Sequence, residues 1–311
     1  FSSRRRHTRY GTVTGVQTCA LPICSDAVGS PFWQRTHNYV NLAITTFKAD
    51  YTQPLAENST IETGYKGIIR SIGTDFQSLN NVNGAYTVVP YQSNTFTFSE
   101  QIHSLYGQYA VNIGESSQPH WKLQLGLRGE YAQNGGNTPD GSVSFTNTYW
   151  NLFPTASAVF YPVQGEFWKF NYGRRINRPT QLNPFTDITD SLNQFSGNPH
   201  LQPEYIESFE LGYSREWEAL SLSATAFFRY ATNTIRGFTR LRSDGVAISR
   251  PENFGTAITY GAEAIATAYP TKFWTVNGSV SLFQQNIDGS NVQAGVGNSL
   301  LTWYEIGRAH V

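Results

Sequence analysis

The chain has 311 residues, and its 22 basic and 22 acidic side chains leave it formally neutral. Its apolar residues are spread thinly and never form the run of about 20 that a membrane-spanning helix needs, which excludes a helical membrane protein. Aromatic residues make up 14% of the chain, glycine is common and charged residues are few, a composition that favours an all-β fold.

The two ends of the chain read as translated DNA rather than as natural protein. Residues 305–311 are what the start of a common short-read sequencing adapter encodes, and much of the opening matches the reverse strand of the same library sequence. We therefore expect residues 1–24 and 305–311 to be adapter artefacts and residues 25–304 to be one partial domain of a longer gene. The remaining stretch is mildly acidic. The opening arginine run and both cysteines then carry no signal, so we expect no nucleic-acid partner, no disulfide and no cofactor.

Strict two-residue alternation predicts about ten long strands between these ends. The clearest case begins at Trp121, where Leu123, Leu125 and Leu127 share one face and polar neighbours share the other, since successive strand side chains point to opposite sides. In chain order, we predict strands at residues 38–53, 59–72, 96–113, 120–132, 149–162, 166–176, 204–217, 219–232, 256–269 and 273–287.

The connections between these strands alternate in length. Short turns after residues 53, 113, 162, 217 and 269 alternate with long polar loops at residues 73–95, 133–148, 177–203 and 233–255. This is the rhythm of an outer-membrane barrel, with short periplasmic turns and long extracellular loops, and each strand is long enough to cross a bilayer. We expect an antiparallel barrel fragment that forms an open, curved sheet, with unpaired edges near residues 38–53 and 273–287.

Four ordered pieces of sequence between residues 168 and 213 carry a more specific signal. They are YGRRINRP (172–179), LNPF (182–185), GNPHLQPE (197–204) and FELGY (209–213). They resemble the C-terminal barrel of TonB-dependent outer-membrane receptors, especially the outer-membrane β-barrel family common in Bacteroidota. The resemblance implies a receptor in the cell outer membrane of a Gram-negative bacterium, not an enzyme, whose barrel encloses an N-terminal plug and is driven by a TonB-type energy-coupling protein.

The residues of this motif have a physical interpretation beside the resemblance. Proline cannot donate to a strand ladder, and Gly-Asn-Pro favours a turn, so the motif ends one strand, reverses the chain and starts the next. We expect loop architecture rather than ligand contacts from this set: Asn177, Arg178, Pro179, Asn183, Pro184, Phe185, Gly197, Asn198, Pro199, Pro203 and Glu204.

Charged residues on the polar strand faces are candidates for the barrel lumen, where they tune selectivity or hold a plug. The candidates are Arg128, Glu130, Arg175, Glu210, Arg229 and Glu263. Arg174 and Arg175 are adjacent and therefore face opposite sides of the sheet, and the lumenal one is expected to pair with Glu210 or to contact a plug. The histidines are too far apart to predict a zinc site, and no catalytic motif is present.

Three functions fit these patterns. The first is an energy-coupled receptor that imports a scarce, bulky ligand, such as a metal chelate, an oligosaccharide or a peptide. The second is a passive porin-like channel, which would share the strands but lack a plug. The third is a surface β-protein acting as an adhesin, which would need an apolar interior. The expected partners of the first are outer-membrane lipid, the plug of the same full-length chain, the TonB-type protein and a ligand that the sequence does not identify.

Overall fold

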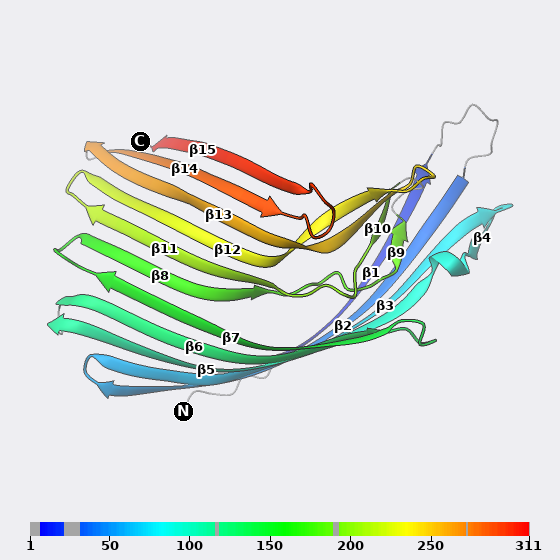
Figure 1. The fold of residues 1–311 in the computed structure, drawn as a ribbon, viewed down its shortest axis with the longest axis horizontal. Coiled ribbons are helices and arrows are strands. Elements are labelled where there is room, and N and C mark those ends of the chain that lie inside the picture. Colours follow the sequence, from blue (N-terminus) through cyan, green and yellow to red (C-terminus); the bar gives the residue numbers. More distant parts are fainter. Residues whose placement is uncertain (1–6, 22–31, 116–117, 189–192, 272, 311) are drawn as a thin grey trace.

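The structure, a computed structural model, describes residues 7–21, 32–115, 118–188, 193–271 and 273–310, and it is almost entirely β (Figure 1). A single turn of 3-10 helix, η1 (Pro90–Gln92), interrupts the strands in these ranges. The strands are β1 (His7–Leu21), β2 (Phe32–Ala56), β3 (Ser59–Val82), β4 (Ala85–Val88), β5 (Asn94–Glu115), β6 (Gln118–Asn137), β7 (Ser144–Phe160), β8 (Glu166–Asn177), β9 (Thr186–Ile188), β10 (Asn193–Ser196), β11 (Glu204–Glu216), β12 (Leu220–Leu241), β13 (Ala247–Thr271), β14 (Trp274–Asp288) and β15 (Gly297–His310). No helix within the described ranges is both long and apolar enough to cross a membrane.

The strands form one sheet in which successive long strands pair with their neighbours in sequence. The pairing runs β1-β2-β3-β5-β6-β7-β8-β11-β12-β13-β14-β15, and every pair along this path is antiparallel. Figure 1 shows the sheet as a curved wall, with the short turns gathered at the left and the longer connections at the right. These ends are called the short-turn end and the long-loop end below. The predicted open, curved, all-β sheet is confirmed.

The predicted strands lie where they were expected, but most of them are longer. Three of the four predicted long loops are mainly strand, because β3, β6, β12 and β13 continue far beyond their predicted limits. The reason is turn chemistry: Asn83 and Gly84 both have positive φ, of 53° and 88°, which a two-residue hairpin turn requires. Gly141 and Gly245 have positive φ in the two corresponding turns. Only the loop at residues 177–203 is largely irregular.

The prediction of unpaired edges near residues 38–53 and 273–287 is wrong for residues 38–46 and 275–287, whereas residues 48–53 pair with β3 alone among the described strands. The first half of β2 pairs with β1, and β14 pairs along its length with β15, so that β1 and β15 are the outer strands. Every strand edge offers unpaired backbone groups, and almost any neighbouring segment can pair with them. The pairing of β1 and of the end of β15 therefore does not bear on the origin of residues 1–24 and 305–311.

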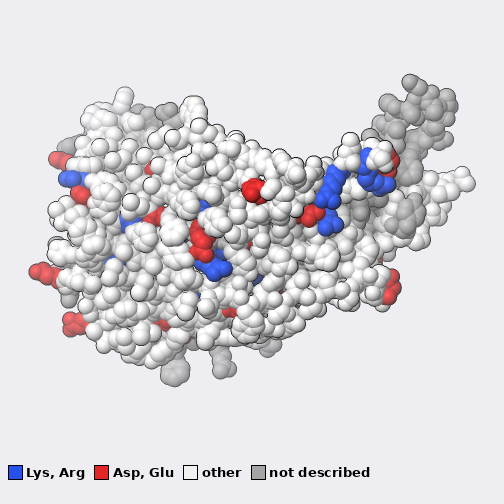
Figure 2. Space-filling view, viewed as in Figure 1, with Lys and Arg blue, Asp and Glu red and all other residues white. Residues whose placement is uncertain are grey.

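The two faces of the wall differ in chemistry. Leu105, Leu125 and Trp150 lie on one face, where Leu125 keeps 61% and Trp150 77% of its surface exposed. Exposure of this kind is expected of a face that meets hydrocarbon rather than water. Charged and polar side chains alternate with these residues onto the other face. Figure 2 shows that most of the surface in this view is uncharged, with acidic side chains over the short turns at its left edge.

The polar face is the concave one, because side chains from strands that are not neighbours meet on it. The segment at residues 178–203, outside the gap at 189–192, is called the strap here, and it folds over this face at the long-loop end. Its Leu182 and Leu201, at 2% and 0% exposure, pack against Phe96 and Phe98 of β5. Ile235 of β12 also packs against this cluster. The strap therefore joins both sides of the concavity through an apolar contact.

The wall is split between β7 and β8 toward the long-loop end. Their ladder runs from Phe160–Trp168 to Thr155–Gly173 and stops there, although β7 begins at Ser144 and β8 continues to Asn177. Beyond this point β7 pairs only with β6, and β8 pairs only with β11. The split places the end of β8 and the start of the strap above the concave face of β6.

Candidate functional site in the concave wall

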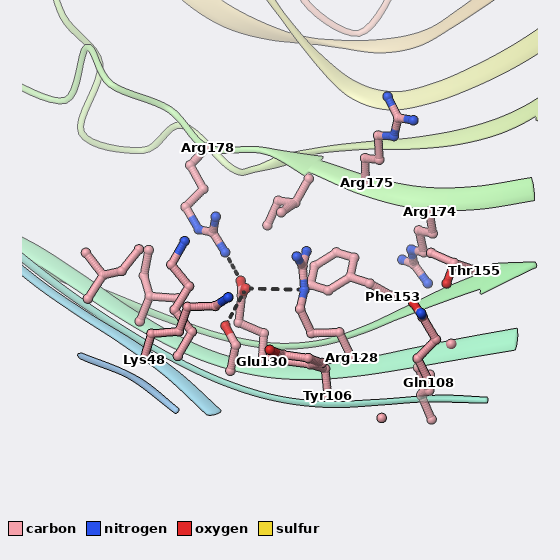
Figure 3. A pocket seen from close by; sticks show the side chains of 18 residues that line it. Lys48, Tyr106, Gln108, Arg128, Glu130, Phe153, Thr155, Arg174, Arg175 and Arg178 are labelled. Carbon is pink, nitrogen blue, oxygen red and sulfur yellow. Dashed lines mark hydrogen bonds and ion pairs between the residues drawn. The ribbon is translucent and has the colours of Figure 1, made fainter. Parts of the chain in front are cut away.

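A buried carboxylate, Glu130 of β6, lies at the centre of a group of charges below the split. Arg178, the first residue of the strap, forms an ion pair with Glu130. Arg128 Nε lies 3.8 Å from the same carboxylate, and the Ser104 hydroxyl donates a hydrogen bond to it at 3.0 Å (Figure 3). A buried charge needs this kind of compensation, since an unpaired carboxylate in a dry site is costly.

A recess of about 690 Å³ opens around this carboxylate. Its charged lining consists of Lys48, Lys66, Arg128, Glu130, Arg174, Arg175 and Arg178. Figure 3 shows Arg178 directed toward Glu130 from above, whereas the Arg175 side chain points away from it. The remaining lining includes apolar side chains, among them Ile68, Ile102 and Phe153. The recess thus combines an apolar surface with a large excess of basic over acidic groups.

The lysines of the recess come from β2 and β3, which cross the concave wall next to β5. Lys48 and Lys66 are directly opposite each other in the ladder, and both are exposed. Lys48 Nζ lies 2.6 Å from Asp50, which also accepts a hydrogen bond from the Tyr106 hydroxyl. Among the described residues, no carboxylate lies within ion-pair distance of Lys66. The two lysines therefore form a like-charge pair of which only one member is neutralised.

The structure places the sequence-predicted lumenal residues on one face but in separate groups. Arg128 and Glu130 meet in the recess, whereas Glu210 pairs with Arg229 at 3.6 Å. Glu263 accepts a hydrogen bond from Ser281 at 3.2 Å and lines a second recess, of about 320 Å³, together with Arg229.

Of the two alternatives predicted for the lumenal member of the Arg174–Arg175 pair, the contact between Arg175 and Glu210 is not formed. Arg175 is exposed and has no carboxylate partner within the described ranges, because Glu210 already pairs with Arg229. Arg174 is on the opposite strand face, as its sequence position requires, and it lies 3.4 Å from Glu207, its cross-strand neighbour on β11.

The family-motif residues build the strap and its joints. Asn198 donates to the Pro251 carbonyl and to Glu252, and its side-chain oxygen accepts from the His200 amide. Its own amide donates to the Gln181 carbonyl. Gly197 lies so close to the Asn183 carbonyl that an added Cβ would clash with that oxygen.

Other motif residues fix the two ends of the strap. Asn177 donates to the buried Glu204 at 2.9 Å, which ties the end of β8 to the start of β11. Pro179 and Pro203 are buried, and Phe185 packs on Phe96 with ring centroids 6.5 Å apart. The Pro184 carbonyl accepts a hydrogen bond from Ser196. Pro199 is half-buried in the turn that follows Asn198.

Sequence reasoning missed part of this site. Arg178 was assigned to the loop and Glu130 to the lumen, but their pairing depends on the strap folding over the wall. Lys48, Lys66 and the Arg70–Glu100 ion pair of 2.5 Å were also missed. Strand parity was the available signal, because these residues occupy the polar face of β2, β3 and β5. Among the described residues, no group of His, Cys, Asp and Glu side chains is arranged to hold a metal ion.

Comparison with known proteins places this wall in a family. The model of the outer membrane protein beta-barrel family matches residues 25–309. The fold is similar to that of the copper transporter OprC, with a TM-score of 0.66, 11% identity, and coverage of 92% of this chain and 44% of OprC. The unliganded ferric citrate transporter FecA gives a TM-score of 0.58 and 12% identity, with coverage of 91% and 40%.

The fold is also similar to that of a third solved structure. The ferric yersiniabactin uptake receptor FyuA from Yersinia pestis gives a TM-score of 0.52 and 10% identity, with coverage of 90% of this chain and 40% of FyuA. The chain thus spans less than half the length of each of these proteins, which are transporters and receptors rather than enzymes. The chain belongs to the outer membrane protein beta-barrel family of the Gram-negative outer membrane, and its fold is that of the barrel region of TonB-dependent receptors.

Proposed function

We propose that the full-length protein is a TonB-dependent receptor that imports a scarce, bulky ligand across the outer membrane, such as a metal chelate, an oligosaccharide or a peptide. The observation that carries this proposal is the fold: over 90% of the chain matches the barrels of copper and ferric-chelate transporters. In this proposal the convex apolar face contacts lipid and the concave face borders the path of the ligand.

The proposal includes two partners beyond the lipid. A plug domain of the same full-length protein would lie inside the barrel next to the concave face, and a TonB-type protein would supply energy from the inner membrane. The lumenal charges, Arg128, Glu130, Arg175, Glu210, Arg229 and Glu263, would face this plug or the ligand. The strap would hold the wall in shape at the long-loop end, which agrees with its hydrogen bonds within itself and to Pro251 of β13.

The test begins with sequencing of the source DNA across both ends of this chain, which recovers the complete reading frame. The full-length protein is then purified from outer membranes and inserted into planar lipid bilayers. A plugged receptor should give no steady ion current, because the plug closes the lumen, and removal of the plug-coding segment should produce one. A steady current from the intact protein would instead identify a passive channel.

Energy coupling is tested in cells. A strain that depends on this gene for growth on a limiting nutrient should lose that growth when its TonB-type gene is deleted, while the barrel remains in the outer membrane. Screening iron, copper and glycan limitation would narrow the ligand class. Growth that is independent of the TonB-type gene would contradict the proposal.

A further inference from the structure

The recess at the β7–β8 split has the size and lining of a small-molecule site. Its volume of about 690 Å³ falls within the range of about 300–1,000 Å³ that is common for ligand pockets. Such pockets combine an apolar lining with a few charged groups that fix the orientation of the ligand. Ile68, Ile102 and Phe153 supply the first, and the lysines and arginines supply the second.

The charges in the recess are not balanced within the described part of the chain. Its lining contains six basic side chains and one acidic side chain, Glu130. Outside the lining, Asp50 pairs with Lys48 and Glu207 pairs with Arg174, which leaves an excess of three basic charges. Glu130 is already engaged by Arg178, Arg128 and Ser104, so it has little capacity for a further cation. The local field is therefore positive, and an anion that enters the recess would meet charge-assisted donors from several directions.

The opposed lysines point to the same conclusion. Like charges directly opposite each other across two strands destabilise a sheet, and Asp50 neutralises only Lys48. A solute with carboxylate or phosphate groups would reduce this repulsion by binding between Lys66 and the two arginines that pair with Glu130, Arg128 and Arg178. The apolar part of the lining would contact its carbon skeleton.

We propose that this recess binds an organic polyanion, a solute that carries at least two carboxylate or phosphate groups. The inference rests on the proposed function and narrows its ligand class from bulky solutes in general to anionic ones. Lys48, Lys66 and Arg128 would contact the anionic groups, and Arg178 would act by positioning Glu130 and Arg128 rather than by contacting the ligand.

The test measures binding to the full-length protein in detergent by isothermal titration calorimetry. The probes are citrate, which carries carboxylates, and fructose 1,6-bisphosphate, which carries phosphates, so the two arms separate the two anionic groups. Wild-type protein should bind at least one probe, with an affinity that falls as salt rises because salt screens exposed charges. The Lys48→Gln/Lys66→Gln variant should bind it at least about tenfold more weakly.

A matched control removes the same charge elsewhere on the same face. Lys122 and Lys169 are exposed, and both are opposite Val159 in their ladders, closer to the short-turn end. The Lys122→Gln/Lys169→Gln variant should keep wild-type affinity. No binding by wild-type protein, equal losses in the two double variants, or full affinity in Lys48→Gln/Lys66→Gln would overturn the proposal.

Thermal unfolding without ligand separates this site from a contact with another part of the same protein. Lys66→Gln alone leaves the Lys48–Asp50 pair intact. If the recess is empty, this variant should leave the melting temperature unchanged or raised, because the repulsion between the two lysines is lost. A fall in that temperature would mean that Lys66 contacts an acidic group of the same full-length protein, and it would overturn the proposal. If the full-length protein gives no steady ion current in bilayers but also binds neither anion, the proposed receptor function is retained and only the proposal of an anion site is rejected.

Discussion

The concave face contains two regions that are close together and differ in how they are stabilised. At the long-loop end the strap packs Leu182 and Leu201 against two phenylalanines, and this cluster is closed to solvent. At the split the same face is open and charged, and its groups are held by ion pairs around Glu130. Arg178 belongs to both regions, because its backbone begins the strap and its side chain extends into the recess. The comparison indicates that one concave face combines an apolar contact that joins its two sides with an open region stabilised by ion pairs.

The largest effect is expected from the apolar region. Leu201→Ala should lower the free energy of unfolding by about 2–5 kcal/mol, because it leaves a cavity in a site with no exposed surface. Leu241→Ala, at a position that is 75% exposed, should change it by less than about 0.5 kcal/mol. Urea unfolding of the full-length protein measures both, and equal effects would mean that the strap is not packed as described.

The charged region should respond to loss of its carboxylate. Glu130→Gln should cost about 3 kcal/mol, near the lower end for breaking a buried ion pair, because Arg178 keeps about a fifth of its side chain exposed. Asp244→Asn breaks the exposed Arg242–Asp244 pair and should cost no more than about 1 kcal/mol. The urea midpoints of the two variants measure these two losses of stability. A Glu130→Gln variant with the stability of the wild-type protein would contradict the central role of this residue.

Backbone contact in the strap provides a smaller test. Gly197→Ala forces the new Cβ against a carbonyl oxygen, and overpacking of this kind costs about 1–3 kcal/mol. Gly237→Ala on β12 has no atom within 4 Å of the added carbon and should be tolerated. Limited proteolysis should cut the Gly197→Ala strap faster than the wild-type strap. Equal cleavage rates for the two glycine variants would count against a tightly closed strap.

The smallest effect concerns pH at the long-loop end. Hydrogen bonds from Thr138 and Ser142 hold the pKa of Asp140 below its ordinary value. A lowered folded-state pKa means that the ionised form is favoured by folding, so the contribution is present above the ordinary pKa of about 3.9 and is lost as pH falls through the folded value. The urea concentration at the unfolding midpoint should therefore be higher for the wild-type protein than for Asp140→Asn at pH 6. The difference between the two midpoints should become smaller near pH 3. A gap that does not change with pH would assign the difference to something other than ionisation.

The strand pattern was largely predictable from sequence, because alternation depends on residues two positions apart. Strand lengths were underestimated, since polar residues at 73–95, 133–148 and 233–255 were interpreted as loops. The Asn83-Gly84, Asp140-Gly141 and Asp244-Gly245 dipeptides are hairpin signals, and they would have corrected these limits.

The site was less predictable than the sheet. Parity placed Arg128 and Glu130 on the polar face, but no local pattern relates Glu130 to Arg178, which is separated from it by β7 and β8. That contact exists because the strap folds back and because the β7–β8 ladder stops early. Both features depend on packing between distant segments, which two-residue periodicity does not encode.

The early end of the β7–β8 ladder also has a mechanical consequence. On the short-turn side of Thr155–Gly173 a backbone ladder joins the two strands, and on the long-loop side none does. On that side the described contacts across the opening are made by side chains, namely the strap cluster and the Arg178–Glu130 pair. Separating the two strands at the long-loop end would therefore require the loss of these side-chain contacts, and every strand ladder would stay intact.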